Sequence, residues 1–147
     1  MLEHYIENFD PEEYVKRFQK DQGGITKKLA IEILRRKIPA ESYYQRNIKK
    51  YLEQMYGEEI YVRKVTQGPY SEGGIADLMV VIRGKYIGLE VKRPVVGHPS
   101  KLQLENKRLV ESAGGVYAIV RWPEEADAVI RYVIGGTPDR WTTSTTI

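Results

Sequence analysis

The most constraining stretch of the sequence is a pair of alternating apolar segments joined by a two-residue turn. The segments cover residues 75–82 and 85–92, and Arg83-Gly84 between them is typical of a tight β-hairpin turn. If the loop holds only these two residues, counting back along both strands places Asp77 directly opposite Glu90. A bulge or a longer loop would shift this register, so the pairing is an expectation that depends on the turn.

The second segment of the hairpin separates an apolar face from a polar one. Strand side chains alternate, so Gly88, Glu90 and Lys92 share one face and the apolar residues between them line the other. Directly opposed residues have Cβ atoms roughly 4.5–5.5 Å apart, and like charges at that separation destabilise a sheet. A divalent cation between Asp77 and Glu90 would compensate for this repulsion.

Composition limits which metals such a site can hold. The chain has no cysteine, and only His4 and His98 could supply an imidazole, so disulfides and thiolate sites are excluded. A metal site must then be built from oxygen, which favours Mg²⁺ or Mn²⁺ over zinc.

The chain is expected to form one globular domain. Its 147 residues are 41% apolar and 29% charged, which is typical of a soluble folded protein. No apolar run approaches the ~20 residues of a membrane span, and the first residues are acidic rather than typical of a signal peptide. We therefore expect no membrane association and an intracellular location: cytoplasm or nucleoid, or the host cytoplasm if the source is viral. The net charge of +3 permits a polyanionic partner without demanding one.

Hydrophobic spacing and capping residues predict the remaining elements. Helices are expected from Pro11 to about Lys20, from a Thr26 cap through Lys37, from Glu41 to about Tyr56, from a Ser100–Gln103 capping box to Gly114-Gly115, and from Pro123 to about Val133. Further strands are expected at 60–66 and 116–121, with a glycine-rich loop at 67–74. The predicted buried side of the fourth helix is Leu102, Leu109, Val110 and Ala113.

This order of elements predicts an α/β fold with a mixed sheet and an additional helical segment in front. We expect an N-terminal helical extension over residues 1–40, an α/β domain over 41–136 that carries the motifs described next, and a flexible tail over 137–147.

At this point the motifs resemble a known family. They are Gly74-Ile75-Ala76-Asp77, then thirteen residues on Glu90-Val91-Lys92-Arg93-Pro94, then Ser100 with Gln103, then Gly114-Gly115 before a strand. The ordered set is similar to the virus-type replication-repair nuclease (VRR-NUC) domain of the PD-(D/E)XK nuclease superfamily, whose core is restriction-endonuclease-like. The superfamily's proline before the motif aspartate is absent here.

The resemblance implies a site residue by residue. Asp77 and Glu90 match the metal-binding acids, the Val91 carbonyl would add a backbone ligand, and Lys92 matches the lysine that positions or activates water. Glu41 resembles a helical glutamate added to the metal site, although a carboxylate in the first turn of a helix also favours the helix dipole. Gln103 resembles a helical glutamine facing the metal, and the capping box is an equal alternative.

Basic residues near the predicted site edge are candidates for phosphate contacts. Each is also explained as a solvated charge. They are Arg63, Lys64, Arg93 and Lys101.

The function implied by this reading is a Mg²⁺- or Mn²⁺-dependent DNA endonuclease that acts on branched DNA, such as four-way junctions or flaps, in replication, recombination or repair. The alternatives are a non-catalytic nucleic-acid-binding module, a non-selective single-strand nuclease and a restriction-like nuclease. Since one site cuts one strand, paired cuts at a junction favour a homodimer. Apolar residues of the first 40 positions, including Ile31 and Leu34, are candidates for its contact.

Overall fold

The fold is α/β, as the sequence predicts. The computed structural model describes residues 2–69 and 72–135, and the expected tail at 137–147 lies outside them. Within these ranges the helices are α1 (Pro11–Asp21), α2 (Lys27–Lys37), α3 (Glu41–Tyr56), the 3₁₀ turn η1 (Gly57–Glu59), α4 (Lys101–Ser112) and α5 (Pro123–Gly135). The strands are β1 (Ile60–Lys64), β2 (Leu78–Ile82), β3 (Lys85–Val91) and β4 (Val116–Val120). Each predicted helix and strand is present, with ends that differ by a few residues.

The four strands form one mixed sheet in the order β1-β2-β3-β4. β1 and β2 are antiparallel, as are β2 and β3, whereas β4 runs parallel to β3. Ile82 pairs with Lys85 across the turn, so the predicted hairpin register is confirmed. The ladder ends at the pair Leu78–Leu89, and Asp77 and Glu90 lie one step beyond it.

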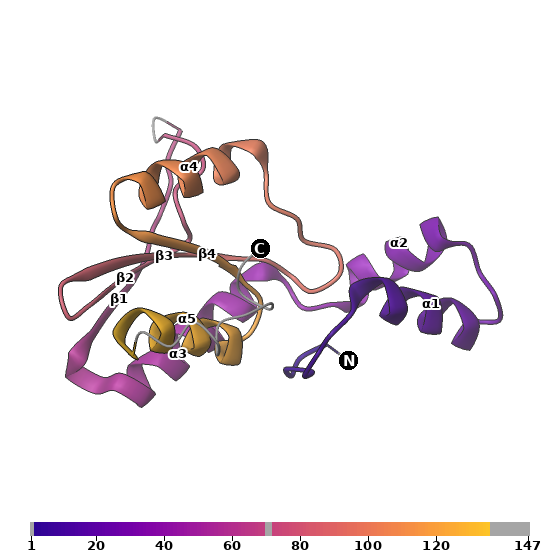
Figure 1. The fold of residues 1–147 in the computed structure, drawn as a ribbon. Coiled ribbons are helices and arrows are strands. Elements are labelled where there is room, and N and C mark those ends of the chain that lie inside the picture. The colour runs from indigo at the N-terminus through magenta and orange to yellow at the C-terminus, as the bar shows by residue number, and fades with distance from the viewer. Residues whose placement is uncertain (1, 70–71, 136–147) are drawn as a thin grey trace.

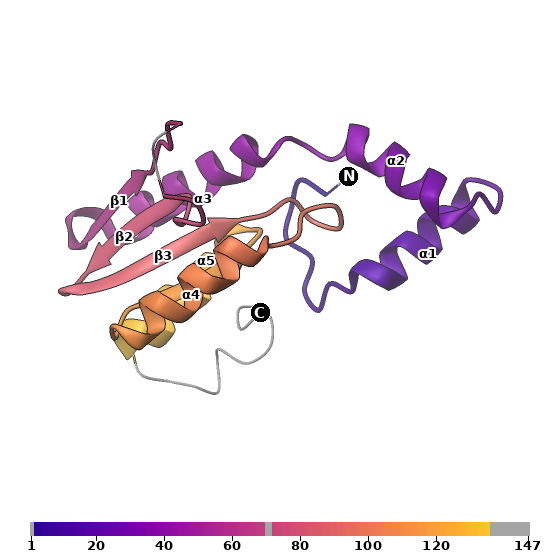
Figure 2. The ribbon, with the colours of Figure 1, turned by 90° about the horizontal axis from the view of Figure 1, so that it is seen from above.

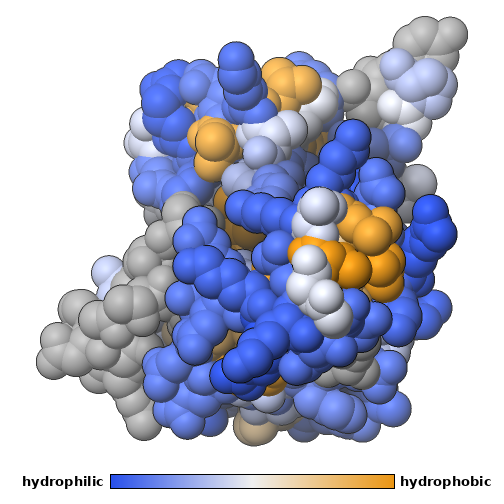
Figure 3. Space-filling view, turned by 90° about the vertical axis from the view of Figure 1, so that its right-hand side faces the viewer, coloured by the Kyte–Doolittle hydropathy of each residue, from blue (hydrophilic) through white to orange (hydrophobic). Residues whose placement is uncertain are grey.

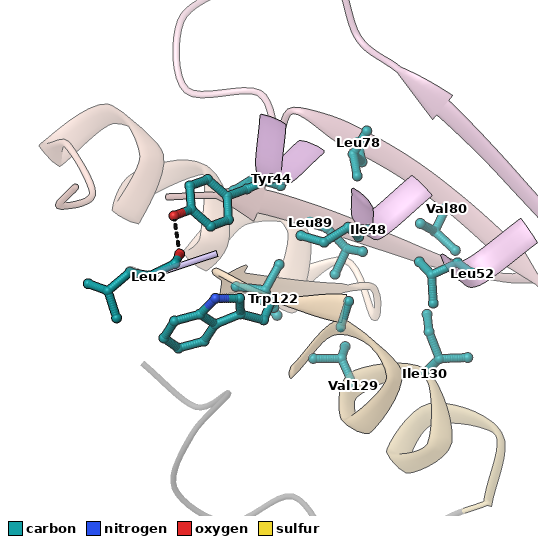
Figure 4. Close-up of a cluster of buried hydrophobic side chains, with 14 of the residues drawn as sticks. Leu2, Tyr44, Ile48, Leu52, Leu78, Val80, Leu89, Trp122, Val129 and Ile130 are labelled. Carbon is teal, nitrogen blue, oxygen red and sulfur yellow. Dashed lines mark hydrogen bonds between the residues drawn. The ribbon is translucent and has the colours of Figure 1, made fainter. Parts of the chain in front are cut away.

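Helices cover the two faces of the sheet unequally (Figure 1). α3 and α5 pack together against one face, and α4 lies on the other face against β4. Figure 4 shows the main core, in which Ile48 and Leu52 of α3 meet Val129 and Ile130 of α5 below the strands. Trp122 is 1% exposed at the edge of this cluster. α3 therefore holds its first residue, Glu41, at a fixed place against the sheet.

The predicted buried side of α4 is correct for Val110 and wrong for Leu102, Leu109 and Ala113. Leu102 and Leu109 are 60% and 50% exposed, and none of the helix's residues is fully buried. Beside Val110, the side of α4 that faces the sheet carries Gln103 and Lys107, which contact β3 and β4. This side is polar because it faces the functional groups described below rather than a second apolar core.

α1 and α2 form a helical hairpin, here called the arm, that extends beyond the end of the sheet (Figures 1 and 2). Asp10 caps α1 and Thr26 caps α2, as expected from their sequences. Inside the arm Val15 and Phe18 pack near Ala30 and Leu34 in a cluster continuous with the main core. In the described ranges no helix is long and apolar enough to cross a membrane.

Candidate active site

Segments that are distant in the sequence bring five polar side chains to the same end of the sheet. Asp77 immediately precedes β2, Glu90 lies near the end of β3 and Lys92 directly follows it. Glu41 opens α3, and Gln103 is in the first turn of α4. The residues of the predicted site therefore lie together at the open end of the β2–β3 hairpin, away from its turn.

The backbone holds Asp77 in position from two sides. Its carbonyl accepts a hydrogen bond of 2.8 Å from Val65 N–H, and its carboxylate Oδ2 accepts one of 2.9 Å from Val91 N–H. The second bond links the two strands where the ladder ends. One carboxylate oxygen of Asp77 is therefore used for orientation.

The backbone geometry at position 74 explains why the motif before Asp77 begins with glycine. Its φ is +84°, a conformation that L side chains rarely adopt. A Cβ at this position would lie 2.4 Å from the backbone oxygen of Leu102. Glycine thus allows the loop before β2 to pack against the start of α4.

Glu90 is an almost completely buried acid, with 1% of its surface exposed. Its Oε1 accepts a hydrogen bond of 2.5 Å from Gln103 Nε2 and lies 3.5 Å from Lys92 Nζ. The Tyr117 hydroxyl lies 3.4 Å from its Oε2 and 3.1 Å from the carbonyl oxygen of Gly74. Only one of these groups, the lysine, carries a positive charge to balance the carboxylate.

The environment favours the protonated forms of Glu90 and Glu41. Burial, together with the neighbouring carboxylate of Asp77, raises the pKa of Glu90 to about 8, and Lys92 opposes this shift only in part. Burial and the charge of Asp77 also raise the pKa of Glu41, against Lys92, Arg93 and Lys64. Perturbed acids of this kind gather at functional sites because chemistry, rather than stability, requires them to be buried together.

Gln103 forms the predicted capping box and also contacts Glu90, while a role toward a metal stays a prediction. Its backbone N–H donates to Ser100 Oγ at 3.2 Å, and its side-chain Oε1 accepts from Ser100 N–H at 2.8 Å, which completes the capping box. The amide nitrogen of the same side chain donates to Glu90. The start of α4 and the orientation of Glu90 are therefore coupled through one residue.

The donor set fits an oxygen-bound divalent cation. Two adjacent carboxylates, one of them buried with incomplete charge balance, would gain the positive charge they lack. In the residues that the structure describes, no group of three His, Cys, Asp or Glu side chains is positioned to hold a metal ion. The participation of Glu41 and of the Val91 carbonyl therefore stays a prediction.

The four predicted phosphate contacts have different surroundings. Arg63 lies over the Tyr61 ring, 4.4 Å from its centroid, and donates to the Val62 carbonyl. Lys64 is close enough to influence the pKa of Glu41, and Lys101 is exposed at the first residue of α4. Contact with phosphate stays a prediction for these three residues.

Arg93, the fourth, is bonded to the arm. Its Nε donates to the carbonyl of Pro39 at 2.9 Å, and its Nη2 donates to those of Arg35 at 2.6 Å and Ile38 at 2.7 Å. Most of its donor capacity is therefore used within the fold.

Sequence reasoning missed two features of the site. Tyr117 is one; its pKa is raised by burial and by Glu90. Its place follows from the parallel pairing of β4 with β3, which sets Tyr117 beside Gly88, two residues before Glu90 on the same face. The sequence alone does not contain this pairing. The second feature is a cleft of about 630 Å³ lined by Lys92, by the loop after it and by residues of the N-terminal segment, among them Tyr5 and Phe9.

Comparison with known proteins gives one structural likeness. A solved structure described as a VRR_NUC domain is similar to this chain, with a TM-score of 0.48 and 25% sequence identity over 60% of this chain and 95% of that one. That description is the family whose motifs the sequence resembles. No family model and no curated protein matches the chain.

Proposed function

We propose that the protein is a divalent-metal-dependent DNA endonuclease that hydrolyses phosphodiester bonds at the Asp77–Glu90–Lys92 site. The observation that carries the proposal is the burial of Glu90 beside a second carboxylate and a lysine. A carboxylate pair is costly to bury, and the lysine alone balances only part of the charge. A Mg²⁺ or Mn²⁺ ion would balance the remaining negative charge, and both ions prefer oxygen ligands such as the carboxylates of Asp77 and Glu90.

Each side chain has a role in this proposal. The bound ion would offset the negative charge that develops on the phosphate and would lower the pKa of a coordinated water. Asp77 and Glu90 would hold the ion, and the Asp77 carboxylate is oriented for this by its hydrogen bond from the Val91 N–H. The Lys92 ammonium orients the attacking water and stabilises charge on a nonbridging oxygen. Gln103 keeps Glu90 in its orientation.

The proposed substrate is branched DNA, a four-way junction or a flap. The modest net charge and the lack of a sequence-reading module support recognition of DNA shape rather than of bases. The resemblance in sequence motifs supports the same class. Paired cuts at a four-way junction would require two sites, and a homodimer would supply them.

Of the two residues expected from sequence at the contact of such a dimer, Ile31 is partly exposed and stays a candidate. Leu34 is fully buried inside the arm and is not available to a second copy. Leu29 of the same helix is 43% exposed, so it is a better candidate for that role.

The proposal is tested with a labelled panel of single strands, duplex, flaps and four-way junctions, incubated with Mg²⁺ and with chelator. We expect cleavage of the branched substrates that needs the metal and that shows little dependence on sequence. Binding to the panel without cleavage under any metal condition would contradict the enzyme and favour a non-catalytic nucleic-acid-binding module. Cleavage of one duplex sequence at matched salt would favour a restriction-like nuclease.

A further inference from the structure

The arm concentrates the positive charge of the molecule. α1 and α2 carry eight basic residues against four acids, a surplus of four that exceeds the +3 of the whole chain. All eight are exposed. They are Lys16, Arg17, Lys20, Lys27, Lys28, Arg35, Arg36 and Lys37.

In the residues that the structure describes, none of these charges forms an ion pair, whereas several of the cations elsewhere do. Over the described ranges, the ion pairs all lie outside α1 and α2 and include Lys107–Glu111, Arg121–Glu125 and Arg131–Asp127. Within α2, Glu32 is four residues from both Lys28 and Arg36, a spacing that permits pairing, and forms neither pair. The arm therefore presents a field of uncompensated cations.

Arg93 fixes the arm relative to the active site. Its three hydrogen bonds go to carbonyls at the end of α2 and in the connection to α3, groups that a helix end leaves unsatisfied. Arg93 directly follows Lys92, so the segment that continues β3 carries both a site residue and the residue that holds α2. These bonds therefore restrain the arm's direction together with its apolar packing, which is continuous with the main core.

We infer that the exposed face of α2 binds the phosphate backbone of DNA next to the cleaved bond, and that Arg93 is a positioning residue for this contact. The inference rests on the proposed function and assigns part of its substrate to the arm. Lys28 and Arg35 are two helical turns apart, on the side of α2 opposite the buried Ala30 and Leu34, and Arg36 adjoins them. The helix is about 16 Å long, which matches roughly five base pairs of duplex. The end of the molecule to which the arm belongs is largely hydrophilic, with hydrophobic side chains gathered in two smaller places (Figure 3).

The first test measures the salt dependence of DNA affinity in EDTA, where no cleavage occurs. The variant Lys28→Gln/Arg35→Gln/Arg36→Gln is compared with Arg46→Gln/Lys50→Gln/Lys85→Gln, which removes the same charge from exposed sites outside the arm. Each lost phosphate contact lowers the slope of log affinity against log salt by about 0.9. We expect the magnitude of this slope to fall by about 2 to 3 in the arm variant and by less than 1 in the control variant. Equal slopes for the two variants would overturn the inference.

The second test concerns Arg93 and the length of the substrate. Arg93→Lys keeps the charge but cannot make the same fork of hydrogen bonds. For the parent protein, KM should fall when the DNA beside the cleaved bond is extended from two to eight base pairs. In Arg93→Lys this benefit should be reduced several-fold while circular dichroism stays unchanged. A length dependence equal to that of the parent would contradict the positioning role.

Since the salt test needs no cleavage, an inactive parent protein would count against the proposed function and leave the arm test intact.

Discussion

Gln103 and Glu90 are joined by a hydrogen bond of 2.5 Å, from the Nε2 of the first to the Oε1 of the second. The other end of the Gln103 amide closes the capping box of α4 with Ser100. A single side chain therefore links the start of a helix to Glu90, the most buried acid among the described residues, and stability and activity should depend on it separately.

This double role is tested by comparing Gln103→Ala with Ser100→Ala. Ser100→Ala removes the cap alone and should lower the free energy of unfolding by about 1 kcal/mol with cleavage retained. Gln103→Ala should have a similar cost in stability and should also lower the cleavage rate about 10- to 100-fold, as expected when a residue that orients a metal ligand is lost. Urea unfolding and initial cleavage rates measure the two effects. Equal rates for the two variants would show that the contact with Glu90 has no functional role.

The raised pKa of Glu90 predicts how the stability of the metal-free protein depends on pH. The folded protein keeps the Glu90 proton up to about pH 8, whereas the unfolded chain loses it near 4.5. Unfolding therefore releases a proton between these values. The stabilisation from this group is full below about pH 4.5 and is lost as the pH rises through about 8, with a slope of up to about 1.4 kcal/mol per pH unit.

Glu90→Gln should remove this dependence, because an amide does not titrate. In EDTA the parent protein should lose stability between pH 5 and pH 8 more steeply than the variant, and at pH 8 the variant should be the more stable of the two. Urea unfolding at several pH values measures this, with Glu58→Gln, an exposed site, as the control. Parallel curves for parent and Glu90→Gln would contradict the assignment of the buried charge.

Gly74 should be sensitive to the smallest substitution. Gly74→Ala forces a side chain into a φ of +84° and brings a Cβ to 2.4 Å from the Leu102 backbone oxygen. We expect a loss of about 2–4 kcal/mol in the free energy of unfolding from strain and overpacking. Gly68→Ala in the same loop, where a Cβ meets nothing within 4 Å, should change stability by less than about 0.5 kcal/mol. Thermal unfolding of the two variants decides whether Gly74 has this structural role.

The centre of the site could be predicted because its geometry is local. A two-residue turn at Arg83-Gly84 determines the register of the whole hairpin, and alternation then places Glu90 and Lys92 on one face. The capping box of α4 is equally local, since Ser100 and Gln103 are three residues apart. In both cases the number of residues between two positions nearly determines their relation in space.

The remaining features depend on contacts that the local pattern does not contain. The leucines of α4 repeat as those of a buried face do, but the helix turns Gln103 and Lys107 toward the sheet, because Glu90 and the Tyr117 carbonyl offer them hydrogen bonds. Arg93 reaches carbonyls more than 50 residues earlier in the chain. Periodicity identifies a helix but not which of its sides the tertiary structure will bury.

The most direct test of the proposed catalytic site is the Mg²⁺-dependent cleavage rate of Lys92→Ala on the best branched substrate, with Lys85→Ala, at an exposed position by the hairpin turn, as the control. Both variants should fold like the parent, because each removes a charged side chain rather than apolar volume from the core. Loss of a group that orients the nucleophile and stabilises charge should lower the rate about 10²- to 10⁴-fold in Lys92→Ala and leave Lys85→Ala within a few-fold of the parent. A folded Lys92→Ala protein that cleaves DNA at the parent rate would contradict the site.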